Sequence, residues 1–276
     1  MKAPGRGDRP RRGIPLRTIV PNAVTAMALC SGLFGIRFAI GGEWDKAVGA
    51  VVLAAILDGL DGRIARLLNG QSRFGAELDS LSDVTAFGVA PAIILYLWVL
   101  QPLAGLGPDL ERWNRYGWLF LLAYAVCAAL RLARFNANID AVEQPHKSAG
   151  FLTGVPAPAG AGLVLLPVYL WSWTEEPLLR EPWLAAPWAA VVGFLMISNL
   201  ATFSWGSMRL RSHVRLGALV VIALVFAALI SAPFPTLSVA ALLYALMIPV
   251  SIASYAKVKG QRAADLNRPE PPAPAA

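Results

Sequence analysis

Residues 50–67 read AVVLAAILDGLDGRIARL, and residues 74–100 read FGAELDSLSDVTAFGVAPAIILYLWVL. Each stretch joins a long apolar run to carboxylates near one end. Apolar runs of about 20 residues are long enough to cross a bilayer core of about 30 Å as helices. The two stretches therefore predict consecutive membrane helices whose acidic ends meet at a short polar turn.

Similar apolar runs fill most of the 276-residue chain. Hydrophobic residues make up 57% of the sequence and charged residues only 15%, whereas soluble domains carry about 25% charged residues. Runs of this length favour helices over barrel strands, because a helix satisfies its own backbone in lipid. We therefore expect an all-α, polytopic membrane helical bundle of about eight transmembrane helices. The expected spans lie near 18–40, 44–66, 82–100, 116–135, 154–173, 183–204, 216–232 and 237–256.

The net charge of +7 is unevenly distributed between the two sides of the membrane. With a cytoplasmic N-terminus, 19 of the 24 Lys and Arg residues fall in cytoplasmic segments, four fall on the other side, and Arg37 lies within the first span. This is the positive-inside pattern, which predicts that both termini are cytoplasmic. The basic excess thus reflects topology: the lipid bilayer is an expected partner and nucleic acid is not.

Composition divides the chain into three parts. Residues 1–17 are rich in Arg, Gly and Pro and are expected to form a basic cytoplasmic N-terminal arm. Residues 18–256 hold the apolar runs and are expected to form one transmembrane domain that also carries the functional site. Residues 257–276 include a Pro-Glu-Pro-Pro-Ala-Pro run, which predicts a disordered cytoplasmic tail.

Four carboxylates lie at the ends of predicted membrane spans, where a charged side chain costs free energy. Asp58 and Asp61 lie three residues apart near the end of the second span, and Asp79 and Asp83 lie four residues apart at the start of the third. Both spacings place the pair on one helix face, so two helices joined by a short turn can direct all four side chains into one pocket. Ionisable groups at membrane depth mark a functional site by default. Mg²⁺ or Mn²⁺, which prefer hard oxygen ligands, would offset their repulsion, and two such ions would balance four charges.

Small residues separate these carboxylates. Gly62 and Ala65 keep the helix surface low enough for a phosphate or nucleotide to approach the backbone. Gly59 and Gly75 allow close helix packing or a tight turn. Arg66 can donate charge-assisted hydrogen bonds to phosphate oxygens. A single Asp or Gly of this kind is ordinarily interfacial or a packing residue, so the prediction of a diphosphate site rests on the combination.

These residues form one pattern: Asp58-x-x-Asp61-Gly62-x-x-Ala65-Arg66, an eight-residue gap, and Gly75-x₃-Asp79-x₃-Asp83. The pattern resembles the signature D-x-x-D-G-x-x-A-R-x₈-G-x₃-D-x₃-D of the CDP-alcohol phosphotransferases, with every fixed position matched. The resemblance implies an integral-membrane enzyme that transfers a phosphatidyl-type group from a CDP-linked lipid to an alcohol and releases CMP. It also implies a six-helix core, followed here by two C-terminal helices without a recognisable motif.

Within that family, the chain is most similar to the phosphatidylserine synthases. The likeness lies in residues 21–25, 74–91, 131–136 and 154–158. Phosphatidylglycerophosphate synthases typically carry Asp-Pro and Ala-Asp-Lys around the last two aspartates, where this chain has Asp79-Ser80 and Asp83-Val84. The resemblance therefore implies CDP-diacylglycerol and L-serine as substrates. It further implies a homodimer in a bacterial inner membrane, with the active site facing the cytoplasm.

By this resemblance the four aspartates ligate two divalent cations, and Asp83 also acts as the general base that removes the proton of the alcohol hydroxyl. The residues expected around the CDP-lipid are Gly62, Ala65, Arg66, Gly75, Asn22 and Thr25. For Asn22 and Thr25, a helix-packing hydrogen bond is an equally good interpretation.

Residues for the serine acceptor carry weaker signals. Arg131 and Arg134 share a helix face at the cytoplasmic end of the fourth span. They either clamp the carboxylate of serine or the lipid phosphate, where bidentate recognition favours Arg, or anchor the helix end. Glu77 either holds the serine ammonium group or is a solvated charge. Lys147 and Ser148 in the following loop are further candidates for binding serine or phosphate.

Three other functions compete with this interpretation. A sibling transferase would use glycerol 3-phosphate, inositol or choline as its alcohol. A membrane prenyltransferase would need a second Asp-rich motif, and nothing after Asp83 resembles one. A divalent-cation transporter, the remotest alternative, would place its carboxylates near the middle of the membrane on distant helices, rather than at one edge beside Arg66.

Overall fold

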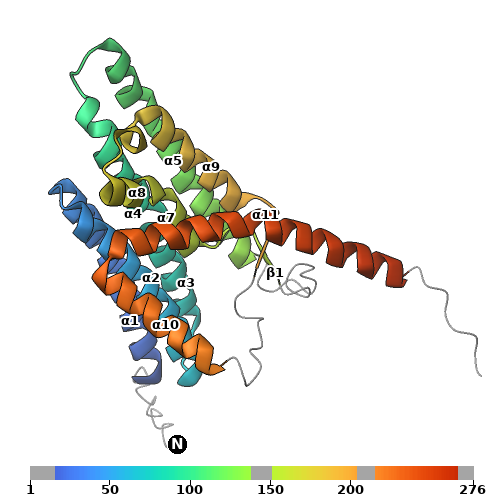
Figure 1. The fold of residues 1–276 in the computed structure, drawn as a ribbon. Coiled ribbons are helices and arrows are strands. Elements are labelled where there is room, and N and C mark those ends of the chain that lie inside the picture. Colours follow the sequence, from blue (N-terminus) through green and yellow to red (C-terminus); the bar gives the residue numbers. More distant parts are fainter. Residues whose placement is uncertain (1–15, 138–150, 204–214, 267–276) are drawn as a thin grey trace, which may run out of the picture.

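The computed structural model describes residues 16–137, 151–203 and 215–266, and nearly all of them are helical (Figure 1). The α-helices are α1 (Leu16–Ile40), α2 (Trp44–Leu67), α3 (Arg73–Asp83), α4 (Ala90–Leu95), α5 (Pro108–Ala137), α7 (Ala157–Val164), α8 (Leu166–Thr174), α9 (Pro182–Ile197), α10 (Arg215–Ser231) and α11 (Pro233–Leu266). The π- and 3₁₀-helical segments are η1 (Val84–Val89), η2 (Tyr96–Leu100), η3 (Gln101–Leu103) and η4 (Pro177–Arg180). The strands are β1 (Phe151–Thr153) and β2 (Ala201–Phe203).

Four helical segments of the described chain are long and apolar enough to cross a membrane. They are Arg17–Ile40, Arg73–Leu103, Pro108–Ala137 and Pro233–Ala256. Shorter apolar helices cover Pro182–Ile197 and Leu216–Ser231. This composition fits an integral membrane protein, but the expected count of eight spans is not confirmed.

The remaining expected spans are interrupted or charged. α2 has 24 residues but carries Asp58 and Asp61 in its second half. The expected span at 154–173 is divided at Leu165 into α7 and α8, and Pro167 lies in the first turn of α8. A proline lacks the N–H group that a continuous helix would need at that point, which accounts for the break.

A two-stranded antiparallel sheet replaces the expected end of the span at 183–204. α9 ends at Ile197, and β2 pairs antiparallel with β1, so the all-α prediction is wrong for these few residues. Gly154 follows β1 with a φ of +72°, and a Cβ there would lie 2.4 Å from the Met196 carbonyl oxygen. The sharp return of the chain against the end of α9 therefore requires glycine at this position.

The third helical segment, from α3 to η3, changes its helical geometry directly after Asp83. The π-helical segment η1 follows, and the buried Tyr124 hydroxyl of α5 donates a hydrogen bond of 2.6 Å to the Phe87 carbonyl oxygen inside it. π-Helical turns are frequent at functional sites. The wider turn changes which face the helix presents, so Ala86 packs against α1 while Asp79 of α3 points toward α2.

α1 packs closely against α2 and against this third segment. A Cβ on Gly32 would lie 2.7 Å from the Ala86 Cα, and one on Gly35 would lie 3.2 Å from the Ala47 carbonyl oxygen. The Ser31 hydroxyl donates to the Ala50 carbonyl oxygen at 2.7 Å. Small residues thus bring three helices together, as is typical of membrane helix packing.

The last two helices differ in how they contact the bundle. Nearly all side chains of α10 from residue 216 onward are exposed, which fits lipid contact. α11 packs on α7, α8 and β2 and extends beyond the bundle (Figure 1). It continues to Leu266, past residue 256, where the sequence places the end of the membrane domain.

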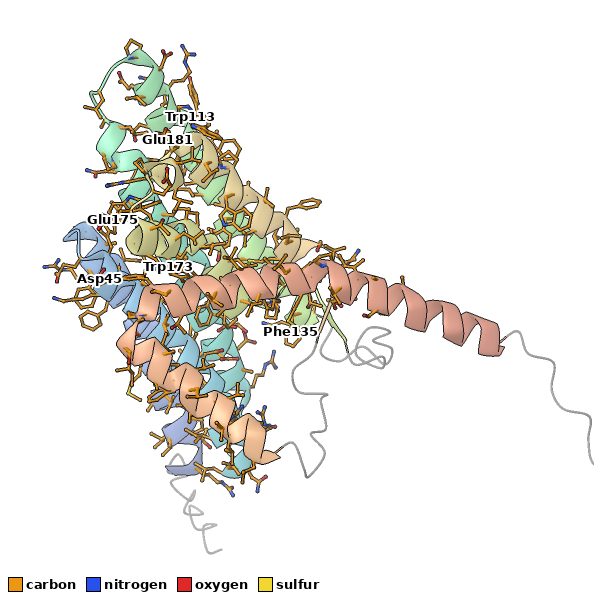
Figure 2. All side chains as sticks on the ribbon, in the orientation of Figure 1. Asp45, Trp113, Phe135, Trp173, Glu175 and Glu181 are labelled. Atoms are coloured by element: carbon orange, nitrogen blue, oxygen red, sulfur yellow. The ribbon has the colours of Figure 1, made fainter. Side chains whose placement is uncertain are left out.

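The two ends of the bundle have different chemistry. Trp113 and Glu181 lie at one end, and Phe135 lies toward the other end of α5 (Figure 2). At the first end, the Arg180 guanidinium lies 5.6 Å from the Trp98 ring and 5.4 Å from the Trp171 ring. The carboxylates of the motif lie toward the Phe135 end.

Candidate metal and nucleotide site

The turn at residues 68–72 sets the start of α3 and thereby the direction of its aspartates. Ser72 adopts an extended conformation, and its hydroxyl accepts a hydrogen bond from the Gly75 N–H at 3.0 Å. This is a serine N-cap, which satisfies one of the free N–H groups at a helix start. Because the helix begins at this point, Asp79 and Asp83 project from the face of α3 that lies toward α2.

Three aspartates form a cluster that can hold a metal ion. Asp58, Asp61 and Asp79 each offer a carboxylate oxygen, and these oxygens all lie within 4.8 Å of one another. Asp61 is only 5% exposed, and the other two are half-buried. All donors are carboxylate oxygens, so the residues present fit a hard divalent cation.

Asp83 lies next to this cluster. Its carboxyl group lies at hydrogen-bonding distance from that of Asp58. Two carboxylates in such contact repel each other unless a proton or a cation lies between them or beside them. Arg131 of α5 lies within electrostatic reach of Asp83, so one guanidinium partly offsets the four carboxylates.

Thr25 links the cluster to α1. Its hydroxyl lies 2.6 Å from Asp61 Oδ2 and 3.1 Å from the Pro21 carbonyl oxygen. The short contact to Asp61 fits donation to a charged acceptor. The Ser82 hydroxyl in turn donates to the Thr25 carbonyl oxygen at 3.3 Å. Thr25 therefore makes a helix-packing hydrogen bond and also lines the site, so the two interpretations of this residue are compatible.

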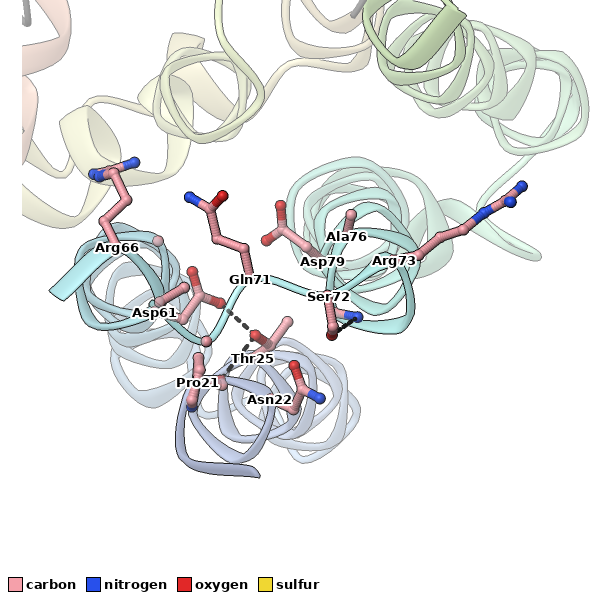
Figure 3. Close-up of a pocket in the computed structure, with 14 residues that line it drawn as sticks. Pro21, Asn22, Thr25, Asp61, Arg66, Gln71, Ser72, Arg73, Ala76 and Asp79 are labelled. Carbon is pink, nitrogen blue, oxygen red and sulfur yellow. Dashed lines mark hydrogen bonds between the residues drawn. The ribbon is translucent and has the colours of Figure 1, made fainter. Parts of the chain in front are cut away.

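A cavity of about 460 Å³ opens beside these carboxylates (Figure 3). Asp61 of α2 and Asp79 of α3 face each other across it, with Gln71 between them, and Arg73 points outward. The lining residues are Pro21, Asn22, Thr25, Asp61, Gly62, Ala65, Arg66, Gly70, Gln71, Ser72, Arg73, Gly75, Ala76 and Asp79. The structure thus brings together all six residues expected around the CDP-lipid.

Glycines keep this cavity open. A Cβ on Gly75 would lie 2.7 Å from Asn22 Oδ1, too close for an unshifted side chain. A Cβ on Gly62 would lie 3.8 Å from Arg66 Nη1, so the guanidinium passes over the bare helix surface. The arrangement leaves backbone, an arginine and carboxylates around one space, which is a suitable lining for a metal-bound diphosphate.

The predicted arginine pair does not act as a pair in the structure. Arg131 faces Asp83, but Arg134 lies at the end of α9. Its Nη1 donates to the Ile197 carbonyl oxygen at 3.0 Å and to Asn199 Oδ1 at 2.9 Å, and its Nη2 donates to the Ser198 carbonyl oxygen at 3.3 Å. A basic side chain that satisfies the last carbonyls of a helix stabilises that helix end.

The other acceptor candidates are less informative. Glu77 is exposed on α3 and does not line the cavity. Lys147 and Ser148 lie outside the described residues. Sequence reasoning missed Gln71 and Ser72, which line the cavity from the turn, and Arg73, which lines it from the first position of α3. The gap between the two halves of the motif was the available signal, because a short turn joining two site helices must border the site.

The comparisons with known proteins agree with this geometry. The family model described as CDP-alcohol phosphatidyltransferase matches residues 18–205, and that described as CDP-alcohol phosphatidyltransferase 2 matches residues 213–249. A protein named CDP-diacylglycerol--serine O-phosphatidyltransferase from Mycobacterium tuberculosis is 38% identical over 246 residues, covering 89% of this chain and 82% of its own. Proteins of the same name are 34% identical over 208 residues in Helicobacter pylori, covering 75% and 81%, and 33% identical over 182 residues in Bacillus subtilis, covering 66% and 88%. The chain belongs to the CDP-alcohol phosphatidyltransferase family.

Proposed function

We propose that this chain is an enzyme that transfers the phosphatidyl group of CDP-diacylglycerol to the hydroxyl of L-serine and releases CMP. The observation that carries the proposal is the approach of carboxylate oxygens of Asp58, Asp61 and Asp79 within 4.8 Å of one another, beside a cavity lined by the small residues and the arginine of the motif. The names of the Mycobacterium, Helicobacter and Bacillus relatives support serine as the acceptor.

In this proposal the donor lies in the cavity between α1, α2 and α3. Gly62, Ala65 and Gly75 let its diphosphate approach the helix backbones, and Arg66 donates hydrogen bonds to its oxygens. Asn22 and Thr25 contribute polar groups from α1. Asp58, Asp61, Asp79 and Asp83 would hold two divalent cations, Mg²⁺ or Mn²⁺. When bound, such ions stabilise charge on the attacked phosphate and on the leaving CMP.

The acceptor approaches from the side of Asp83. A serine hydroxyl is a poor nucleophile at neutral pH and needs a positioned base. Asp83 takes the hydroxyl proton as the serine oxygen forms its bond to the β-phosphorus, the phosphorus that carries the diacylglycerol. The bond from that phosphorus to the bridging oxygen breaks, and CMP leaves with the bonding electrons. Direct in-line attack fits the chain, because the motif offers carboxylates rather than a Ser or His nucleophile.

The same proposal includes topology and assembly. Residues 18–256 form the transmembrane catalytic domain, flanked by a basic arm and a polar tail. The enzyme lies in a bacterial inner membrane with its active site and both termini on the cytoplasmic side, in accord with the positive-inside pattern. A homodimer is expected from the family resemblance.

The test is CMP release by the purified full-length chain in detergent, with CDP-diacylglycerol, Mn²⁺ or Mg²⁺, and one alcohol at a time. We expect release with L-serine that is lost on adding a chelator. Release only with glycerol 3-phosphate, inositol or choline would assign the chain to a sibling transferase. Asp83→Asn should abolish turnover while CDP-diacylglycerol binding remains measurable, and retained turnover would refute the role of Asp83 as base.

A further inference from the structure

One face of α11 brings polar groups into the interior of the bundle. Ser238, Ala241, Tyr244, Ile248 and Ser251 follow one another at helical spacing of three or four residues, so they share a face. This face packs on α7, α8 and β2. Four of these five residues are buried, and the fifth, Tyr244, has a buried hydroxyl.

The Tyr244 hydroxyl reaches the neighbourhood of Arg131. Arg131 lies within electrostatic reach of both Tyr244 and Asp83, which connects α11 to the catalytic side of the site. Tyr244 also lies beside Thr202 of β2. The Thr202 hydroxyl donates its own proton to the Gly154 carbonyl oxygen at 2.8 Å, which fixes its position.

Two polar atoms at this place lack partners. Arg131 Nε and Tyr244 Oη are buried and make no hydrogen bond of normal geometry within the part of the chain that the structure describes. A buried donor without a partner costs free energy, so proteins seldom retain one without a ligand or another use. Both groups donate hydrogen bonds, and one of them carries a positive charge, so the pair suits an anion.

We infer that Arg131 and Tyr244 bind the carboxylate of the acceptor serine, and that α11 thereby contributes a specificity-determining residue. The inference rests on the proposed function. Serine carries its hydroxyl and its carboxylate a few bonds apart, so the two ends can reach Asp83 and the Arg131–Tyr244 pair at once. The carboxylate of Asp83 repels that of serine, which favours the orientation with the hydroxyl toward Asp83.

This pair also separates serine from choline and inositol. An anionic acceptor gains two hydrogen-bond donors at this place. The choline cation would be repelled by the guanidinium of Arg131. Neutral inositol would leave the charge of that guanidinium unpaired. A site built to hydrogen-bond one group discriminates strongly against an analogue that lacks it. Serinol, which replaces the serine carboxylate by a hydroxymethyl group, therefore tests the pair directly.

The experiment compares Tyr244→Phe with wild type in the full-length chain. We expect the KM for L-serine to rise about tenfold to 100-fold, as for the loss of a hydrogen bond to a charged group. The KM for CDP-diacylglycerol and kcat/KM for serinol should stay within about twofold. The Tm in detergent should fall little, because Thr202, the polar group beside the removed hydroxyl in the described chain, keeps its own hydrogen bond to the Gly154 carbonyl oxygen. Ser238→Ala, which removes another unpartnered hydroxyl from the same face of α11, is the matched control and should leave all four quantities unchanged.

Three results would overturn the inference. An unchanged KM for serine in Tyr244→Phe would mean that the hydroxyl does not touch the acceptor. A lower Tm together with an equal loss of kcat/KM for serine and for serinol would indicate a structural role of the hydroxyl. If the wild type uses another alcohol instead of serine, the proposed function fails separately. That result overturns the inference as well, and it is distinguished from the first two by the lack of serine-dependent CMP release in the wild type.

Discussion

Replacing Thr25 by Val isolates the contact between α1 and the aspartate cluster. Valine keeps the shape of threonine but removes the hydroxyl that lies 2.6 Å from Asp61 Oδ2. Because Asp61 and Thr25 are both buried, little water reaches the place that the lost hydroxyl leaves beside the carboxylate. The substitution therefore leaves packing nearly unchanged while it removes one hydrogen bond from a candidate metal ligand.

The size of the effect follows from the geometry. An O–H···O⁻ hydrogen bond of about 2.5–2.7 Å is of the charge-assisted kind, and hydrogen bonds to charged groups contribute about 1.5–3 kcal/mol. Partners that orient metal ligands typically change metal affinity or activity by about 10–100-fold when they are removed. We expect the Mn²⁺ concentration for half-maximal CMP release to rise by that factor in Thr25→Val.

The assay is CMP release against Mn²⁺ concentration at saturating substrates. Thr25→Ser retains a hydroxyl at the same place and should stay within about threefold of wild type, given the spread among single hydrogen bonds. An unchanged Mn²⁺ requirement in Thr25→Val would refute the argument that Thr25 orients Asp61. An equal rise of the Mn²⁺ requirement in Thr25→Val and Thr25→Ser would show that the hydroxyl alone does not account for the effect.

Two further substitutions test the cavity and the end of α9. Gly75→Ala places a Cβ 2.7 Å from Asn22 Oδ1. Overpacking of about 1–3 kcal/mol should raise the KM for CDP-diacylglycerol about tenfold and leave the KM for serine unchanged. A KM for CDP-diacylglycerol equal to that of wild type would mean that the donor binds elsewhere. Arg134→Gln removes the bonds to the Ile197 and Ser198 carbonyl oxygens, so stability in detergent should fall by about 1–3 kcal/mol with little change in the KM for serine. A raised KM for serine at unchanged stability would instead support a role of Arg134 in binding the acceptor.

The motif predicted much of the site because its logic is local. Helical spacing alone places Asp58 with Asp61 and Asp79 with Asp83 on single faces, and a short turn must bring the two pairs together. The small residues at 62, 65 and 75 could be interpreted in the same way, because a residue without a large side chain leaves the helix surface low wherever the helix packs. The structure accordingly brings Asp61, Asp79 and the small residues around one cavity, and Asp58 joins the two aspartates in the cluster beside it.

Features that depend on contacts between distant segments could not be predicted in this way. The antiparallel sheet of 151–153 and 201–203 needs two strands about fifty residues apart, and each is too short to show a period of its own. The π-helical turn after Asp83 is bonded to Tyr124, whose hydroxyl looks like an ordinary membrane aromatic in the sequence. Tyr244 lies on a helix without a motif, and only packing brings it to Arg131.

The geometry of the carboxylates depends on a helix that supplies none of them. The turn at 68–72 joins α2 to α3 but leaves the angle between them free. α1 removes that freedom at both ends of the contact, because Thr25 bonds Asp61 of α2 and accepts a bond from Ser82 of α3. Farther along, Gly32 packs against Ala86 without room for a methyl group. The separation of the candidate metal ligands is therefore set by how closely α1 packs, which is why substitutions on this helix should act on metal affinity rather than on the chemical step.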